Sequence, residues 1–219
     1  MRLALVSIAL CVLLALFPQI DLSVSSLFYD HGFYLKDLWA AKIVYKAAQI
    51  VIALTALLLV ALLVAALLGK EVVKKRILIY LLAVLIVGPG LIVNVVFKDH
   101  FGRARPAQIV EFGGTKQFTP ALVPTDQCHK NCSFSSGHAA AAFYFLAFVP
   151  LFHGRKRLIV AAAALAWGSV VGFVRIIQGG HFFSDVICSA VVVYLVSLLM
   201  YNLFLKDSDE NFGSHTGDE

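Results

Sequence analysis

The sequence predicts an all-α, polytopic membrane protein with six transmembrane helices. Of its 219 residues, 60% are hydrophobic and only 14% are charged, well below the roughly 25% charged residues of a soluble domain. The apolar residues gather in six separate runs, and no linker, internal repeat or low-complexity tract divides them. We therefore expect a single helical domain over residues 1–206, followed by an acidic, disordered cytoplasmic tail at residues 207–219.

Each apolar run has roughly the length of a membrane-spanning helix. The runs lie at residues 3–17, 47–68, 77–97, 137–152, 158–177 and 186–205. A helix needs about 20 residues to cross a bilayer, with a range of about 17–25. Four runs meet this length, and we expect the short first and fourth runs to extend into flanking polar residues. The first run could also be a signal peptide, but no clean small-x-small cleavage site follows it, which favours a retained helix.

Basic residues predict the side of the membrane on which each loop lies. Clusters at residues 70–76 and 155–157 separate the second run from the third and the fourth run from the fifth. If the helices alternate in direction, both clusters lie on one side together with Arg2 and Lys206, and the positive-inside rule makes that side cytoplasmic. The net charge of +5 is explained by this topology and by cationic motifs on the outer side. No pattern typical of nucleic-acid binding is present.

Two outer segments are long enough to have structure of their own. Residues 21–46 mix aromatic and charged side chains, a composition that suits a partly helical segment lying along the membrane surface. Residues 98–135 contain three prolines and the pair Gly113-Gly114. We expect this second segment to be a structured loop or cap, and not a further span.

The four cysteines fall into two pairs. Cys11 and Cys188 lie within apolar runs, where they are expected to be small buried hydrophobic residues. Cys128 and Cys132 lie in the outer loop, and an oxidising compartment favours a disulfide between them. A metal site that uses His129 is an alternative, although Cys-x3-Cys is not the usual zinc spacing, and free thiols are another.

Three short motifs place cationic, imidazole and carboxylate side chains beside apolar runs. They read Lys98-Asp-His-Phe-Gly-Arg-Ala-Arg105-Pro106, Ser135-Ser136-Gly137-His138 and Arg175-x5-His181-x3-Asp185. The predicted topology brings all three to the outer membrane–water boundary. Ionisable groups at membrane depth are costly and usually functional, so this convergence predicts one outer site built from three distant stretches of sequence.

The cations in these motifs suit a phosphate. A phosphoryl group in transfer carries charge on its non-bridging oxygens and needs several fixed cations or N–H donors around it. We expect the phosphate to be bound by the following residues: Lys98, Arg105, Arg175, Ser136 and Gly137. The last two lie at the predicted N-terminus of the fourth helix, where backbone N–H groups and the helix dipole favour an anion. Arg103 is expected to add charge close to the phosphate.

The two histidines and the aspartate suit covalent phosphate chemistry. His181 and Asp185 are four residues apart, which places them on one face of a helix that begins early enough. The carboxylate can then hold one imidazole nitrogen and leave the other free to attack phosphorus. His138 is expected to protonate the departing oxygen as a general acid. This chemistry requires no metal and no other cofactor.

Each of these residues also has an ordinary structural interpretation. Lys98 alone would be an interfacial lysine that snorkels, and Gly179-Gly180 would be a simple turn. Asp99 and His100 could cap or line the outer loop. A non-catalytic channel, transporter or scaffold is the alternative class of function. The joint spacing of the motifs and the lack of charges in the middles of the runs favour the enzyme.

The chain resembles the type 2 phosphatidic acid phosphatase (PAP2) superfamily. The pattern of that family is Lys-x6-Arg-Pro, then Pro-Ser-Gly-His, then Ser-Arg-x5-His-x3-Asp. This sequence matches the first element fully and departs once in each of the others, with Ser135 in place of Pro and Val174 in place of Ser. Within the family it is similar to bacterial lipid A phosphatases of the 4′ type, and the supporting segments are residues 88–94, 97–100, 127–134 and 178–185.

The resemblance implies a metal-independent lipid phosphatase in a bacterial inner membrane, with its site facing the periplasm. The implied substrate is a phospholipid or lipid A within the membrane, with the 4′-phosphate of lipid A preferred. Lipid A 1-phosphate, phosphatidylglycerophosphate and undecaprenyl diphosphate are alternative substrates, and phosphotransfer to another lipid is an alternative reaction. The sequence does not identify protein partners.

Overall fold

The computed structural model describes residues 2–206, and these residues form helices without any β-strand. The helical class predicted from the apolar runs is therefore confirmed. The elements in chain order are α1 (Arg2–Leu16), α2 (Gln19–Ser26), α3 (Trp39–Leu67), α4 (Lys75–Leu85), η1 (Ile86–Phe97), α5 (Lys98–His100), η2 (Pro106–Gln108), η3 (Val110–Phe112), α6 (Gly137–Phe143), η4 (Tyr144–Leu151), α7 (Gly154–Ile177) and α8 (Phe183–Phe204). The predicted tail at residues 207–219 lies outside the described residues.

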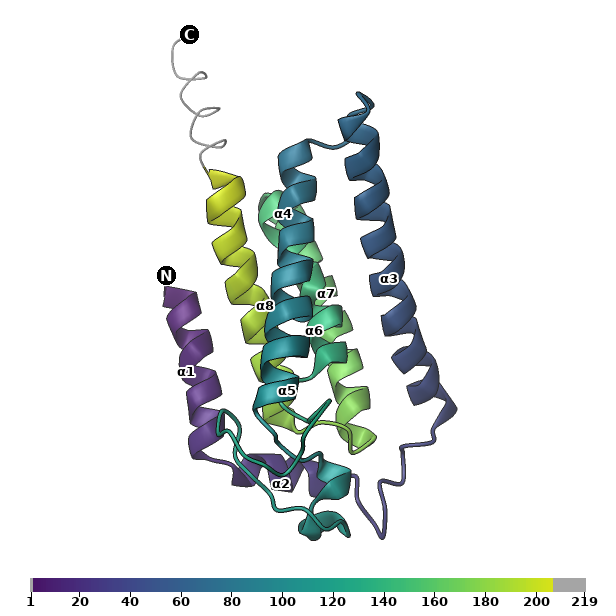
Figure 1. The fold of residues 1–219 in the computed structure, drawn as a ribbon, viewed down its shortest axis with the longest axis vertical. Helices are drawn as coiled ribbons and strands as arrows, with labels where there is room; N and C mark the ends of the chain where they lie inside the picture. The colour runs from purple at the N-terminus through teal and green to yellow at the C-terminus, as the bar shows by residue number, and fades with distance from the viewer. Residues whose placement is uncertain (1, 207–219) are drawn as a thin grey trace.

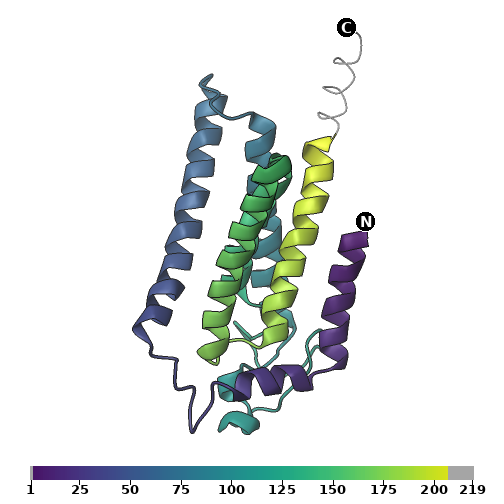
Figure 2. The ribbon, with the colours of Figure 1, turned by 180° about the vertical axis from the view of Figure 1, so that it is seen from behind.

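The long helices stand side by side as one bundle. Figure 1 shows α3 at one side and α1 at the other, with α4, α6, α7 and α8 between them. The short helix α2 lies across one end, bent by 78° from α1, and the long loop between α5 and α6 covers the same end (Figure 2). The loops from α3 to α4 and from η4 to α7 lie at the opposite end. The predicted basic clusters and the predicted site thus occupy opposite ends of the bundle.

Membrane-length helices are fewer than the six predicted. Among the described residues, four helices are long and apolar enough to cross a membrane, and the bent pair α1 and α2 would make a fifth if counted as one span. The fourth apolar run instead forms α6 followed by the 3₁₀ helix η4, which ends at Leu151 and together is shorter than a usual span. The expectation that this run extends to spanning length is not met. Six spans remain a prediction.

The first turns of α3 also differ from the sequence-based expectation. The second run was predicted to start at residue 47, whereas α3 begins at Trp39. Ala41 and Ala48 are buried on one face of these turns, while Lys42 and Lys46 are exposed on another. A prediction from hydropathy leaves these polar turns out of the span. In the structure they stay helical because their alanine face packs against the rest of the bundle.

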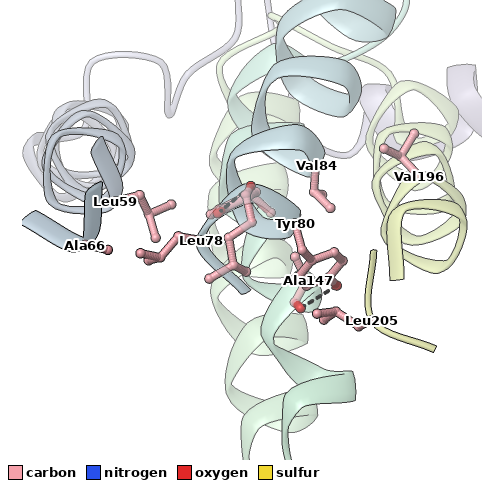
Figure 3. Packing of buried hydrophobic residues seen from close by; sticks show 10 residues of the cluster. Leu59, Ala66, Leu78, Tyr80, Val84, Ala147, Val196 and Leu205 are labelled. Atoms are coloured by element: carbon pink, nitrogen blue, oxygen red, sulfur yellow. Dashed lines mark hydrogen bonds between the residues drawn. The ribbon is translucent and has the colours of Figure 1, made fainter. Parts of the chain in front are cut away.

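A hydrophobic core fills the half of the bundle farther from the predicted site. Leu59, Leu78, Val84 and Val196 come together from three long helices (Figure 3). Tyr80 is fully buried there, and its hydroxyl donates to the carbonyl oxygen of Ala147 at 2.6 Å. A buried hydroxyl needs such a partner, so this contact holds α4 against η4.

Candidate active site

The first motif presents two cations that are joined by one asparagine. Lys98 lies in α5, directly after the π-helical segment η1, and is mostly buried. Its Nζ donates to the side-chain oxygen of Asn131 at 2.9 Å. Arg105 donates through Nη2 to the backbone oxygen of the same residue at 2.8 Å. Asn131 has a positive φ of 53°, a conformation that asparagine tolerates better than most residues, and it sets the spacing of the two cations.

The second motif begins α6 against the first. Ser136 is the N-cap, and its hydroxyl accepts from the N–H of Ala139 at 3.4 Å. A Cβ on Gly137 would lie 2.4 Å from Oδ1 of Asn94 and 3.3 Å from Cε of Lys98. Only glycine therefore lets this helix start so close to the lysine. Gly137, His138 and Lys98 line a shared pocket of about 170 Å³.

His181 lies just before α8 and is almost completely buried, at 1% exposure. Its Nδ1 lies 2.7 Å from the backbone oxygen of Ser133 and 3.7 Å from Oδ2 of Asp185. The carbonyl is thus the hydrogen-bond partner that orients the imidazole, and the carboxylate is a nearby charge. The expectation was that the carboxylate of Asp185 holds this nitrogen; the carbonyl does so instead and likewise leaves Nε2 free.

Burial also keeps His181 neutral. Burial, together with the positive charges of Arg175 and Lys98, lowers the pKa of this imidazole to about 4, and Asp185 opposes the shift. A neutral imidazole is the form that can attack an electrophile. The third motif therefore supplies an unprotonated nitrogen at neutral pH.

Asp185 is held by three groups from different parts of the chain. Its Oδ2 accepts from the hydroxyl of Ser133 at 2.6 Å and from the N–H of Phe182 at 2.9 Å. Its Oδ1 accepts from Nη1 of Arg103 at 2.6 Å. Because every contact is buried, the carboxylate has one orientation beside His181.

Arg103 pairs with two buried carboxylates, whereas it was expected to add charge close to the phosphate. It is 1% exposed, and its guanidinium lies between Asp185 and Asp21 of α2, with Nη2 2.8 Å from Oδ2 of Asp21. Its Nε donates to the backbone oxygen of Thr119 at 2.8 Å. The two carboxylates raise its pKa against the opposing effect of burial. Arg103 therefore positions Asp185 and ties α2 to the site.

Arg175 lies in the last turn of α7, against the turn of the chain that follows. A Cβ on Gly180 would lie 2.2 Å from Nη2 of Arg175, and Gly179 has a positive φ of 63°. The glycine pair thus forms a turn, as its ordinary interpretation holds, and also makes room for the guanidinium. Nη1 of Arg175 donates to the side chain of Gln178, and this hydrogen bond fixes the orientation of the guanidinium.

Tyr45 of α3 joins the second and third motifs. Its ring stacks on His138 with centroids 4.3 Å apart, and the guanidinium carbon of Arg175 lies 5.0 Å from the same ring. Sequence reasoning did not identify Tyr45, because it lies far from every motif and looks like one of several interfacial aromatics. Asp21, Asn131 and Ser133 were missed for a similar reason: each is an isolated polar residue whose partner is distant in sequence.

Three polar atoms in this region are buried and lack a hydrogen-bond partner among residues 2–206. They are the hydroxyl of Ser135, Nε2 of His138 and Nε of Arg175. Buried polar groups normally have partners, so a cluster of donors without them is typical of a site that binds a polar ligand. No group of three or more His, Cys, Asp or Glu residues in the described range could hold a metal ion.

The structure places a disulfide between Cys128 and Cys132, with the Cα atoms 5.6 Å apart. Cys11 and Cys188 are free and buried. The N–H of Cys132 donates to the backbone oxygen of Lys98 at 3.1 Å. The disulfide therefore closes the turn that carries Asn131 beside the first motif.

Comparisons with known proteins agree with this geometry. The family model described as the PAP2 superfamily matches residues 76–209. This chain belongs to the PAP2 superfamily. The PAP2 match covers all three motifs, so the chain is a phosphatase and the enzyme class predicted from the motifs is confirmed.

Curated relatives of this PAP2 protein bear a single name. A lipid A 4′-phosphatase of Francisella tularensis subsp. novicida is 37% identical over 206 residues, which cover 89% of this chain and 90% of the relative. A lipid A 4′-phosphatase of Rhizobium leguminosarum is 41% identical over 125 residues, which cover 54% of this chain and 52% of the relative. A Rhizobium etli protein of the same name is 39% identical over 125 residues, 54% of this chain and 48% of the relative. No solved structure matches the chain significantly.

Proposed function

We propose that this protein is an integral membrane phosphatase that removes the 4′-phosphate of lipid A through a phosphohistidine intermediate. The observation that carries the proposal is the cluster of unpartnered buried donors at Ser135, His138 and Arg175, beside a neutral His181. A phosphate dianion would accept from such donors. The preference for lipid A is supported by the names of the three relatives.

The reaction has two steps. The lone pair of Nε2 of His181 attacks phosphorus and forms a P–N bond, while the bond from phosphorus to the ester oxygen breaks. The negative charge of the bound phosphate favours protonation of His138. The protonated imidazole then gives its proton to the departing oxygen, which leaves as the sugar hydroxyl. Lys98, Arg105 and Arg175 balance the charge on the non-bridging oxygens.

Water completes the cycle. His138, now neutral, accepts a proton from a water molecule as its oxygen attacks phosphorus, and the P–N bond breaks to release inorganic phosphate. Asp185 favours the positive charge that develops on the His181 ring in both steps. No atom or electron is needed from outside the chain, the lipid and water.

The direction of the bundle supports a periplasmic site in a bacterial inner membrane. The basic residues between α3 and α4, at the start of α4 and in the first turn of α7 lie at the end opposite the motifs (Figure 1). The positive-inside rule makes that end cytoplasmic. A site at the other boundary meets the headgroup of a lipid in the outer leaflet.

The test uses purified protein in detergent with a chelator present. It is incubated separately with bisphosphorylated lipid A, phosphatidylglycerophosphate and undecaprenyl diphosphate, and the products are identified by mass spectrometry. We expect loss of one phosphate from lipid A, located at the 4′ position by fragmentation, and no release by His181→Ala. Cleavage of another lipid only would overturn the lipid A preference. Activity retained in His181→Ala would overturn the nucleophile.

A further inference from the structure

A basic pocket lies next to the active site and contains residues that the proposed chemistry does not use. It measures about 490 Å³ and lies between the beginning of α3 and the end of α7. Its lining residues are Lys36, Asp37, Lys42, Ile43, Tyr45, Lys46, Arg175 and Gln178. Four of them are cationic and one is a carboxylate. The pocket therefore favours an anion.

The pocket adjoins the active site through shared residues. Arg175 lines the pocket, and the guanidinium contacts the ring of Tyr45, whose other contact is the stack on His138. Lys98 and His138 line the smaller pocket, whose α3 residues lie farther along the same helix. A ligand that reaches past Tyr45 would thus contact both pockets at once.

Two lysines in the basic pocket are arranged as a pair. Lys42 and Lys46 are one helical turn apart on α3, so their side chains project from the same face. Lys42 contacts Asp37 at 2.8 Å, but both side chains are more than half exposed, at 56% and 69%. An exposed ion pair of this kind contributes little stability, and an incoming phosphate can replace the carboxylate as the partner of Lys42.

A separate apolar groove lies farther from the active site, also between α3 and α7, and shares no lining residue with the basic pocket. It measures about 530 Å³ and is lined by Val51 of α3, by Trp167 and its neighbours on α7, and by aromatic residues of the η4 region. A cationic pocket at the membrane boundary above an apolar groove fits an amphipathic anion. This arrangement favours a lipid over a free polyanion.

We propose that Lys42 and Lys46 bind a second phosphate of the same lipid molecule whose first phosphate reacts at His181. The proposal rests on the proposed function, because it assumes a lipid phosphate at the active site. It adds that the favoured substrates carry two phosphate groups, one in each pocket. Lys42 and Lys46 then determine specificity and take no part in bond cleavage.

The test measures equilibrium binding separately from catalysis. The His181→Asn protein in neutral detergent is titrated with two radiolabelled forms of lipid A, one with both phosphates and one with the 4′-phosphate alone. The titrations are repeated with Lys42→Gln and Lys46→Gln added together. Lys70→Gln with Lys75→Gln, in the loop after α3 and at the start of α4, is the matched control.

We expect the Lys42 and Lys46 double change to weaken binding of the bisphosphorylated lipid about tenfold, as two partly exposed ion pairs acting together would. Binding of the monophosphorylated lipid should change less than about twofold, because this lipid has no second phosphate with which the two lysines can pair. Both titrations of the control variant should also change less than about twofold. The double change in the protein that keeps His181 should raise KM for the bisphosphorylated lipid and leave kcat unchanged.

Equal weakening for the two lipids would overturn the proposal. So would an effect that is seen only when phosphatidylglycerol is added to the micelles, because the lysines would then bind a neighbouring membrane lipid. Failure of the proposed function would give a different result, because the protein that keeps His181 would then release no phosphate from either lipid. The binding comparison does not depend on phosphate release, so it would still test the two lysines.

Discussion

Asp21→Ala tests whether α2 is fastened to the active site through a buried carboxylate. Asp21 is 1% exposed and accepts from Nη2 of Arg103 at 2.8 Å, from the N–H of Ser184 at 2.8 Å and from the hydroxyl of Ser184. Alanine would leave these three buried donors without an acceptor. One unsatisfied buried donor costs about 1–3 kcal/mol, and breaking a buried ion pair costs about 3–5 kcal/mol.

These two costs describe overlapping contacts, so the expected loss is about 4 kcal/mol and not their full sum. That is a large part of the roughly 5–15 kcal/mol that stabilises a typical protein, and it corresponds to a fall in Tm of about 10 °C for a chain of this size. Asp21→Asn keeps an acceptor oxygen for Ser184 and removes only the charge. We expect it to cost about half as much.

The assay follows thiol exposure during heating. Cys11 and Cys188 are the free cysteines of the described residues, and both are buried, so a dye that reacts with thiols reports unfolding. Asp30→Ala, at a side chain that is 81% exposed, is the control and should shift the free energy of unfolding by less than about 0.5 kcal/mol. If Asp21→Ala unfolds at the same temperature as Asp30→Ala, the buried network does not contribute as the structure indicates.

Three further predictions concern the site. Because burial and the nearby positive charges lower the pKa of His181 from 6.5 to about 4, the unfolded chain binds a proton below pH 6.5 that the folded chain does not. The free energy of unfolding should therefore fall by about 2 kcal/mol more between pH 7 and pH 5 in the original protein than in His181→Asn, as thermal scans at both pH values would show; equal falls would contradict the shift. A methyl group on Gly180 would lie 2.2 Å from the neighbouring guanidinium, so Gly180→Ala should lower kcat/KM about 100-fold. Gly88→Ala is the control, because a Cβ there would lie no closer than 3.7 Å to its nearest neighbour, and it should leave kcat/KM unchanged. Equal values of kcat/KM for the two variants would show that the position of the Arg175 guanidinium does not matter. Replacing Cys128 and Cys132 with serine should raise KM about fivefold, the equivalent of one hydrogen bond. The reason is that their disulfide closes the turn that carries Asn131, which contacts both cations of the first motif. An unchanged KM would show that the turn keeps its shape without the disulfide.

Long helices were predictable because their signal is local. The last two apolar runs were predicted at residues 158–177 and 186–205, and the structure has α7 at Gly154–Ile177 and α8 at Phe183–Phe204. A run of apolar residues must satisfy its backbone internally in a membrane, and a helix does so within one segment. Helix ends were less predictable, as the early start of α3 at Trp39 shows, because packing of one face decides where a polar turn stays helical.

By itself, the sequence determined the helical class, which follows from its composition, and the chemical types of the motif residues, whose pattern resembles that of the PAP2 superfamily. Only the tertiary structure decided the partners of those residues. Arg103 was expected beside the phosphate, yet it pairs with Asp21, 82 residues away. His181 is oriented by the backbone of Ser133, and Tyr45 stacks on His138 from another helix. Such contacts depend on how the helices pack and on which groups become buried together. Neither can be predicted from a pattern of residues that are neighbours in the sequence.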